Sequence, residues 1–191
     1  MLAEPAILDH SANRNFRDQA ATMGLDPEDR WVGGYVREEW NGVRHLLEGY
    51  FGDIEGRKIL EFGCNYGGSS IIAAHMGATV TGVDIDPDNI ALARHNAAQY
   101  DLAIQPEFLH VPDTRHLPFG DDGFDIIICN SVLEYVDPAM LDAVLSEIKR
   151  CLTPGGHLVI TGTASRIAAK EVHSGRWLVN YWPSWFDTKI L

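Results

Sequence analysis

The sequence predicts an α/β fold built on a parallel, doubly wound sheet. From residue 57 onward, short apolar runs typical of buried strands alternate with segments of helical composition. Several of these runs end at a residue suited to a turn, such as Gly63, Asp84 or Asn130. The length of 191 residues and the hydrophobic content of 46% suffice for one domain with a full core.

The predicted strands are five runs rich in β-branched and apolar residues. They lie at 58–62, 79–83, 105–111, 124–129 and 157–161, and a Pro-Gly-Gly turn at 154–156 precedes the last of them. The run at 124–129 is almost wholly apolar, as in a strand that is buried on both faces. Right-handed crossovers and the glycine-rich turn after the first strand predict the strand order 3-2-1-4-5.

Helices are predicted between these strands. The segment 69–76 has helical composition and stops at Gly77. Asp86 suits the N-cap and Pro87 the first position of an Ala-rich helix that reaches residue 100. A third helix is expected over 140–152, where apolar residues recur on one helical face.

The first 56 residues have a different pattern. Residues 13–15 (Asn-Arg-Asn) and 25–29 are predicted to form loop and turn. Over 30–51, aromatic and aliphatic residues recur at three- and four-residue steps, which predicts an amphipathic helix with a break at Gly33-Gly34. We therefore expect residues 1–56 to form a helical lid over the strand ends, and residues 57–191 to form the main domain.

Composition excludes some classes of partner. With 15 Lys and Arg against 27 Asp and Glu, the net charge is −12, which disfavours binding to nucleic acid or to an anionic membrane surface. No apolar run approaches the roughly 20 residues of a membrane-spanning helix. The three cysteines are widely spaced and the eight histidines show no metal-binding spacing, so we expect a cytoplasmic protein without a metal.

A glycine-rich segment follows the first strand, and two ligand classes compete for it. Gly63, Asn65 and Gly68 fall on the spacing G-x-G-x-x-G, with asparagine in the middle position, where it tolerates a left-handed backbone. Asp84 lies 21 residues after Gly63, about where a dinucleotide fold holds its ribose carboxylate. An NAD(P)-dependent oxidoreductase is therefore one interpretation.

Glu61 favours the other interpretation. An acid at the end of the first strand would repel a pyrophosphate but would attract a cation. S-adenosylmethionine carries a sulfonium and an ammonium group and no phosphate. In that interpretation Asp84 accepts from the ribose hydroxyls and Ile85 covers the adenine, while Asp113 accepts from the adenine amine and the Thr114 N–H faces a ring nitrogen.

Four stretches of the chain resemble a known family at the family's order and spacing. They are ILEFGCNYGG at 59–68, VTGVDIDPDNIALAR at 80–94, PDTRHLPFGDDGFDIIICNSVLEYV at 112–136 and LSEIKRCLTPGGHLVITG at 145–162. Over roughly 57–162 the chain resembles the class I S-adenosylmethionine-dependent methyltransferases of the small-molecule type 11/25 branch, which have a Rossmann-like sheet.

The resemblance implies a role for each matching residue. It assigns Glu61, Gly63, Cys64, Asn65 and Gly67 to the methionine part of S-adenosylmethionine, Asp84 and Ile85 to the ribose and adenine, Asp113 and Thr114 to the adenine edge, and Asn130 to the neighbourhood of the sulfonium. The reaction it implies is transfer of a methyl group to a small-molecule acceptor by in-line displacement. Such a reaction depends largely on positioning and requires no covalent enzyme intermediate.

Three departures from the family pattern affect these expectations: the loop at 65–66, residue 135 and the C-terminal part. Asn65 replaces the middle glycine, Tyr66 replaces a small residue, and Tyr135 replaces a histidine. The family fold normally continues beyond the fifth strand by about 50–60 residues, whereas 29 residues follow Gly162, so we expect a shortened C-terminal part. A cofactor-binding but inactive module is therefore a third interpretation.

Ring-bearing side chains near the predicted cofactor site are the candidates for contact with the acceptor. They are Tyr35, Tyr66 and Tyr135, with Trp31 and His173 as further candidates. The aromatic segment 177–186 is expected to pack on the sheet edge, either within the chain or against a second copy in a homodimer. Since the fourth strand ends in Cys-Asn-Ser-Val and lacks a motif that grips a flipped base, we expect no nucleic acid acceptor.

Overall fold

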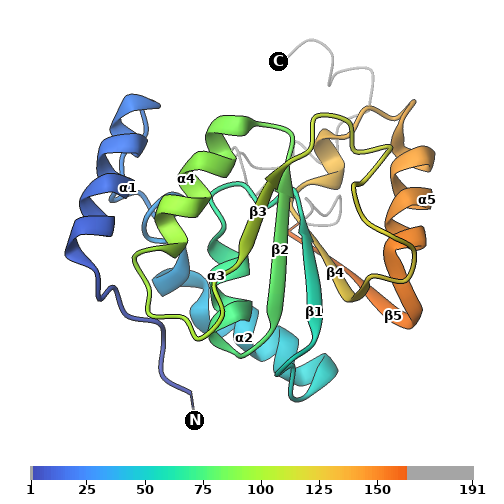
Figure 1. The fold of residues 1–191 in the computed structure, drawn as a ribbon, viewed down its shortest axis with the longest axis horizontal. Coiled ribbons are helices and arrows are strands. Elements are labelled where there is room, and N and C mark those ends of the chain that lie inside the picture. The colour runs from blue at the N-terminus through green and yellow to red at the C-terminus, as the bar shows by residue number, and fades with distance from the viewer. Residues whose placement is uncertain (1, 163–191) are drawn as a thin grey trace, which may run out of the picture.

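Five parallel strands form the centre of the molecule in the order β3-β2-β1-β4-β5 (Figure 1). They are Lys58–Phe62 (β1), Thr79–Asp84 (β2), Glu107–His110 (β3), Phe124–Asn130 (β4) and Leu152–Thr161 (β5). The predicted strand order is confirmed, and β1 lies in the middle of the sheet. The structure is a computed structural model that describes residues 2–162; the predictions for His173 and for the segment 177–186 lie outside the described residues.

Helices cover both faces of this sheet (Figure 1). Five α-helices and one 3₁₀ helix are described: His10–Thr22 (α1), Tyr35–Phe51 (α2), Gly68–His75 (α3), Pro87–Ala97 (α4), Leu133–Tyr135 (η1) and Leu141–Cys151 (α5). Side chains of α2, α3 and α4 share one core cluster with the sheet, and α5 shares the other. Helix α1 packs outside α4, so this side of the molecule has an additional layer.

Successive side chains of β1 point in turn to the helix layer of α3 and to that of α5. Ile59 belongs to the core beneath α3, whereas Leu60 and Phe62 belong to the core beneath α5. Since successive side chains of a strand point to opposite faces, Glu61 lies on the same face as Ile59, toward α3. The Glu61 carboxyl therefore accepts a hydrogen bond from Ser70 of that helix.

The prediction of loop at 13–15 is wrong, because these residues lie within α1. The Asp9 side chain caps this helix and accepts from the backbone N–H groups of Ser11 and Ala12. Phe16 and Ala20 are buried against Leu92 of α4. A tertiary contact thus stabilises a helix whose polar sequence carried little local signal.

The last strand also differs from the prediction. The turn expected at 154–156 lies inside β5, which begins at Leu152. Pairing with β4 shifts there, since Phe124 is opposite Leu152 and Ile126 is opposite His157. The Pro-Gly-Gly stretch therefore forms an irregularity within the strand pairing rather than a boundary.

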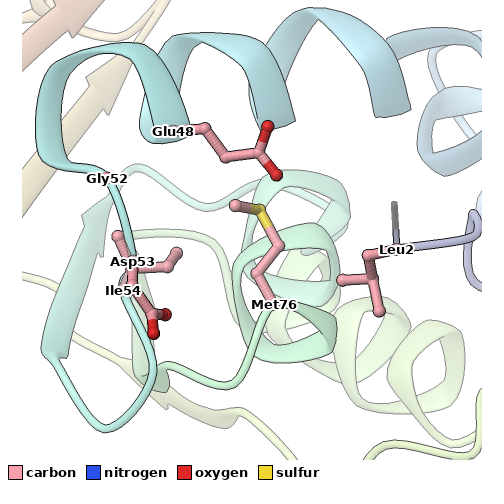
Figure 2. A pocket seen from close by; sticks show the side chains of 6 residues that line it. All are labelled: Leu2, Glu48, Gly52, Asp53, Ile54 and Met76. Carbon is pink, nitrogen blue, oxygen red and sulfur yellow. The ribbon is translucent and has the colours of Figure 1, made fainter.

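Helix α2 begins directly after Gly33-Gly34, where the break was predicted. Trp40 and Leu47 are buried in the core beside α3, so most of α2 belongs to the helix layer. Its carboxyl end lies where the strands begin, near a shallow hollow (Figure 2). The residues that line this hollow are Leu2, Glu48, Gly52, Asp53, Ile54 and Met76. The amino end of α2, by contrast, lies at the carboxyl ends of the strands, where Tyr35 contacts Asn130.

Candidate functional site

The carboxyl ends of the strands form one edge of the sheet, which we call the carboxyl edge. A buried acid lies at its centre. Only 4% of Glu61 is exposed, and Ser70 donates a hydrogen bond to its carboxyl group. Burial raises the pKa of Glu61 to about 7, although hydrogen bonds from Ser70 and Ser69 oppose this rise. A cationic ligand at this place would favour the ionised carboxylate and would itself be held by it.

The glycine-rich loop folds tightly above this acid. The N–H groups of Gly63 and Cys64 both donate to the Val83 carbonyl at 2.9 Å. Asn65 has φ +48°, which confirms that asparagine provides the left-handed backbone expected at this position. Gly67 has φ +76°, and a Cβ at that residue would lie 2.7 Å from the Phe108 ring, so only glycine fits there.

Asp84 ends β2 and is 9% exposed. Its carboxylate accepts from the backbone N–H groups of Asn65 and Asp86 at 2.9 Å and from the Asn89 amide at 3.3 Å. A carboxylate offers about four acceptor positions, so about one remains for a ligand hydroxyl. The adjacent Ile85 side chain is 62% exposed, which leaves its apolar surface open to an aromatic ring.

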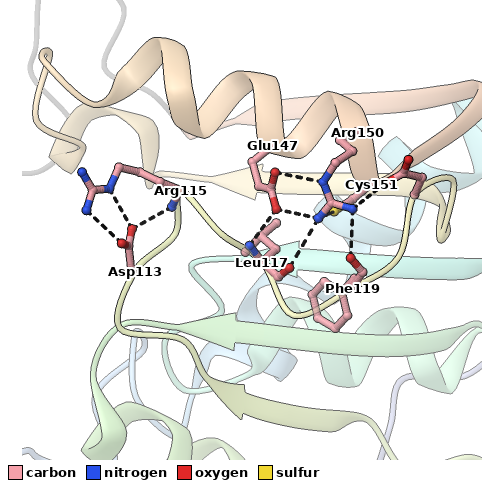
Figure 3. Close-up of polar contacts among 8 residues, drawn as sticks. Asp113, Arg115, Leu117, Phe119, Glu147, Arg150 and Cys151 are labelled. Atoms are coloured by element: carbon pink, nitrogen blue, oxygen red, sulfur yellow. Dashed lines mark hydrogen bonds and ion pairs between the residues drawn. The ribbon is translucent and has the colours of Figure 1, made fainter.

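Asp113 follows β3 and forms a bidentate pair with Arg115 (Figure 3). Nε and Nη2 of Arg115 donate to its two oxygens at 2.9 and 2.8 Å, and the Arg115 N–H donates at 3.0 Å. These bonds lower the pKa of Asp113 to about 2. The carboxylate is thus ionised and oriented, and Thr114 lies half-buried beside it.

Asn130, at the end of β4, was predicted as a site residue, but the hydrogen bonds that join it to other polar side chains were not predicted. Its Nδ2 donates to the Tyr35 hydroxyl at 2.8 Å, and its Oδ1 accepts from Thr161 at 3.1 Å. Tyr35 and Ser69 are hydrogen-bonded at 3.1 Å. Ser69 and Ser70 directly follow the glycine-rich loop, and this position was the one signal of their role in the sequence.

The remaining tyrosines occupy different environments. Tyr66 packs against the cluster of α1 and α4 that contains Phe16 and Leu92. Tyr135 is 72% exposed on η1. Trp31 is 50% exposed and lies 6.1 Å from Tyr35 between ring centroids, so an aromatic pair stands at the margin of the carboxyl edge.

These features fit S-adenosylmethionine in chemical terms. The buried Glu61 carboxyl suits the cationic methionine end, and the tight loop brings backbone close to it. Asp84 and Asp113 each retain acceptor capacity for the hydroxyls of the ribose and the amine of the adenine. Arg115, the cation beside Asp113, is held by that carboxylate. The fold and the site define a protein of the Rossmann-like class whose carboxyl edge suits S-adenosylmethionine.

Comparison with known proteins leads to the same class. Residues 60–160, more than half of the chain, match the family described as "Methyltransferase domain". The chain therefore belongs to this family, the class I S-adenosylmethionine-dependent methyltransferases, and its cofactor is S-adenosylmethionine. This assignment favours the methyltransferase interpretation over the NAD(P)-dependent oxidoreductase.

Individual relatives support the family. The chain is 36% identical to a fatty-acid O-methyltransferase of Mycolicibacterium smegmatis over 62% of this chain and 42% of that protein. It is 33% identical to a ubiquinone biosynthesis O-methyltransferase of Psychrobacter arcticus over 69% of this chain and 50% of that protein. The chain thus spans about half the length of the curated relatives it matches.

A solved structure, described as a SAM-dependent methyltransferase of Methanosarcina mazei, shares the fold. It superposes with a TM-score of 0.56 at 30% identity, and the match covers 60% of this chain and 55% of that one. Within residues 2–162, none of the helices has the length and apolar character needed to cross a membrane. In the same range, no three or more His, Cys, Asp or Glu side chains gather as a metal site would require.

Proposed function

We propose that this protein transfers the methyl group of S-adenosylmethionine to an oxygen atom of a small-molecule acceptor. The observation that carries the proposal is the buried Glu61 carboxyl at the end of the central strand, directly below the glycine-rich loop. Two relatives with at least 33% identity are named as O-methyltransferases, which supports an oxygen acceptor. When bound, S-adenosylmethionine supplies a methyl group that a nucleophile displaces from the sulfonium.

The chain's own residues bind and orient in this proposal. Glu61 holds the cationic methionine end with the loop from Gly63 to Gly67 against it. Asp84 accepts from the ribose, and Asp113 accepts from the adenine beside Thr114. Holding two reactants in line at short distance can supply much of the rate acceleration of such a reaction.

The acceptor side of the proposed site is formed by aromatic residues. The segment 30–35 lies at the carboxyl edge, and Trp31 and Tyr35 form an aromatic pair there. Tyr135 on η1 lies on the segment that follows β4 and is exposed. We propose that segment 30–35 and η1 border the acceptor, with residues 1–56 as the N-terminal cap of a main domain over 57–191. The Tyr66 side chain is a further candidate contact.

The cellular setting is also a proposal. Cys64, Cys129 and Cys151 are all free and buried, as expected in a reducing cytoplasm.

A second copy could pair at β5, whose Leu158 and Ile160 side chains are exposed among the described residues. Light scattering at several protein concentrations would test this homodimer, and a monomer throughout would contradict it.

The proposal is tested by incubation of the protein with methyl-labelled S-adenosylmethionine and a panel of hydroxyl- and carboxyl-bearing small molecules. We expect label in the ether or ester product of at least one acceptor. A matched panel of amines separates oxygen from nitrogen transfer. Binding of S-adenosylmethionine without turnover on any acceptor would support the inactive module instead.

A further inference from the structure

A chain of hydrogen-bonded side chains crosses the carboxyl edge of the sheet. The hydroxyl of Thr161 donates to Asn130 Oδ1 at 3.1 Å, and Asn130 Nδ2 donates to the Tyr35 hydroxyl at 2.8 Å. Tyr35 and Ser69 are hydrogen-bonded at 3.1 Å, Asn130 Nδ2 also donates to Ser69 Oγ at 3.4 Å, and the Ser69 hydroxyl lowers the pKa of the neighbouring Glu61 carboxyl. Side chains from β5, β4, α2, α3 and β1 are thereby connected.

The chemistry of the groups fixes the direction of the bond between Asn130 and Tyr35. An amide nitrogen only donates, so the Tyr35 oxygen is the acceptor from Asn130. The Tyr35 proton is then free for Ser69, and the Ser69 proton is free for Glu61. With Tyr35 as donor to Ser69 and Ser69 as donor to Glu61, these hydrogen bonds would all point toward the one carboxyl, an arrangement in which each bond polarises the next.

Tyr35 is the link that comes from outside the βα core. Its ring lies against the backbone of Gly68, where an added Cβ would be 2.3 Å from Tyr35 Cδ1. It is the first residue of α2 and is separated by 34 residues from Ser69 and by 95 residues from Asn130. The contact of α2 with the carboxyl edge therefore also orders these polar side chains.

We propose that Tyr35 is a positioning residue for methyl transfer, which orders Asn130 and Glu61 for the methionine end of the cofactor through its hydroxyl. The proposal rests on the proposed function, because it assigns Tyr35 a role toward the same site. Its hydroxyl acts through Ser69 and Asn130, while its ring fills the space over Gly68. Loss of the hydroxyl would leave Ser69 a weaker donor to Glu61 and the Asn130 amide without its closest partner.

The test is calorimetric titration with S-adenosylmethionine of the wild type and of Tyr35→Phe, which keeps the ring over Gly68. We expect about tenfold weaker binding in Tyr35→Phe, the scale of one buried hydrogen bond. Tyr100→Phe is the matched control, since Tyr100 is a buried tyrosine of the same core that follows α4 and pairs with Ile7, and we expect wild-type affinity from it. Thermal melting of both variants reports on the fold.

The dependence of affinity on pH separates positioning from a merely structural role. The titratable groups that face Glu61 are Asp84, Cys64, Cys129 and Tyr35. The cofactor cation binds best to the ionised carboxylate, so wild-type affinity is expected to rise with pH until Glu61 is ionised. In Tyr35→Phe the weaker donation from Ser69 moves the midpoint of this rise to higher pH.

A double-mutant cycle with Ser69→Ala completes the design. If Tyr35 acts through Ser69, the double variant loses less affinity than the sum of the two single losses. An unchanged midpoint with additive losses would overturn the inference and leave the proposed function in place, as would wild-type affinity in Tyr35→Phe. Failure of the wild type to bind S-adenosylmethionine would overturn both.

Discussion

The backbone N–H of Asn65 donates a 2.9 Å hydrogen bond to the Asp84 carboxylate, which ties the glycine-rich loop to the end of the neighbouring strand β2. Asn65 takes a left-handed backbone conformation, and this turns its N–H toward the acid. In the proposed function Asp84 therefore has two tasks, since it holds the loop through Asn65 and would accept from the ribose. A substitution there is expected to affect both ends of the cofactor.

We expect Asp84→Ala to weaken binding of S-adenosylmethionine by about 2–3 kcal/mol, the scale of lost charge-assisted hydrogen bonds. Calorimetric titration at constant pH measures this loss. An unchanged affinity would contradict the assignment of Asp84 to the ribose.

Asp86→Ala is the matched control for that experiment. The Asp86 side chain accepts from the Asp88 N–H and caps α4, so its loss is expected to reduce the free energy of unfolding by about 1 kcal/mol. Cofactor affinity is expected to stay near the wild-type value, because the cap bond involves no ligand. Equal losses of affinity in both variants would show that Asp84 acts only through the fold.

The pH dependence of stability tests the burial of Glu61. Its pKa is about 7 in the folded protein against an ordinary 4.5, so the folded state binds this proton more tightly. The stabilisation is complete below pH 4.5 and is lost as pH rises through 7, by about 3 kcal/mol in total.

Glu61→Gln has no such proton, so the free energies of unfolding of wild type and variant provide the comparison. Between pH 4.5 and pH 8 we expect the wild type to lose about 3 kcal/mol relative to Glu61→Gln. Denaturant titrations at four or five pH values measure the difference. Parallel curves would mean that the carboxyl has its ordinary pKa.

Gly67→Ala is expected to destabilise the protein by about 1–3 kcal/mol through its left-handed φ, and further through the contact with Phe108. Gly49→Ala provides the opposite case, because Gly49 lies within α2 and a Cβ there meets nothing within 4 Å. That variant is expected to gain about 0.5–1 kcal/mol. Denaturant unfolding measures the free energy of unfolding of both variants. Equal changes in the two variants would contradict the loop geometry.

Arg150 holds the segment after β3 against α5 (Figure 3). It donates to the Phe119 carbonyl at 2.9 Å and to Glu147, which in turn accepts from the Leu117 N–H at 2.8 Å. Arg150→Ala is expected to reduce the free energy of unfolding by about 1–3 kcal/mol. Arg37→Ala removes only an exposed pair with Glu38, so a change below about 1 kcal/mol is expected there. A similar small change in both variants would contradict the role of Arg150 in holding this segment against α5.

Much of the fold could be predicted because most strands and helices carried a local signal. The apolar run of β4 and the Asp86-Pro87 start of α4 are examples, and the structure has both. Helix α1 could not be predicted in this way, since its stability comes from the burial of Phe16 against α4. The irregular start of β5 depends on its pairing with β4 and likewise has no local signal.

The same distinction between local signals and tertiary contacts holds for the candidate site. Glu61, Asp84 and Asp113 could be predicted, because parallel strands end at a common edge and each acid lies at or shortly after the end of a strand. The partners of these acids could not, since Asn65, Ser70 and Arg115 are recruited by loop and helix geometry. The contact of Tyr35 with Asn130 spans 95 residues and became visible only in three dimensions.

Calorimetric titration of the wild-type protein with S-adenosylmethionine and, separately, with NAD⁺ tests the cofactor assignment most directly. We expect one S-adenosylmethionine per chain and no heat of binding for NAD⁺, because the buried Glu61 carboxyl attracts a cation and repels a pyrophosphate. Binding of NAD⁺ in preference to S-adenosylmethionine would contradict both the role of Glu61 and the proposed methyl transfer.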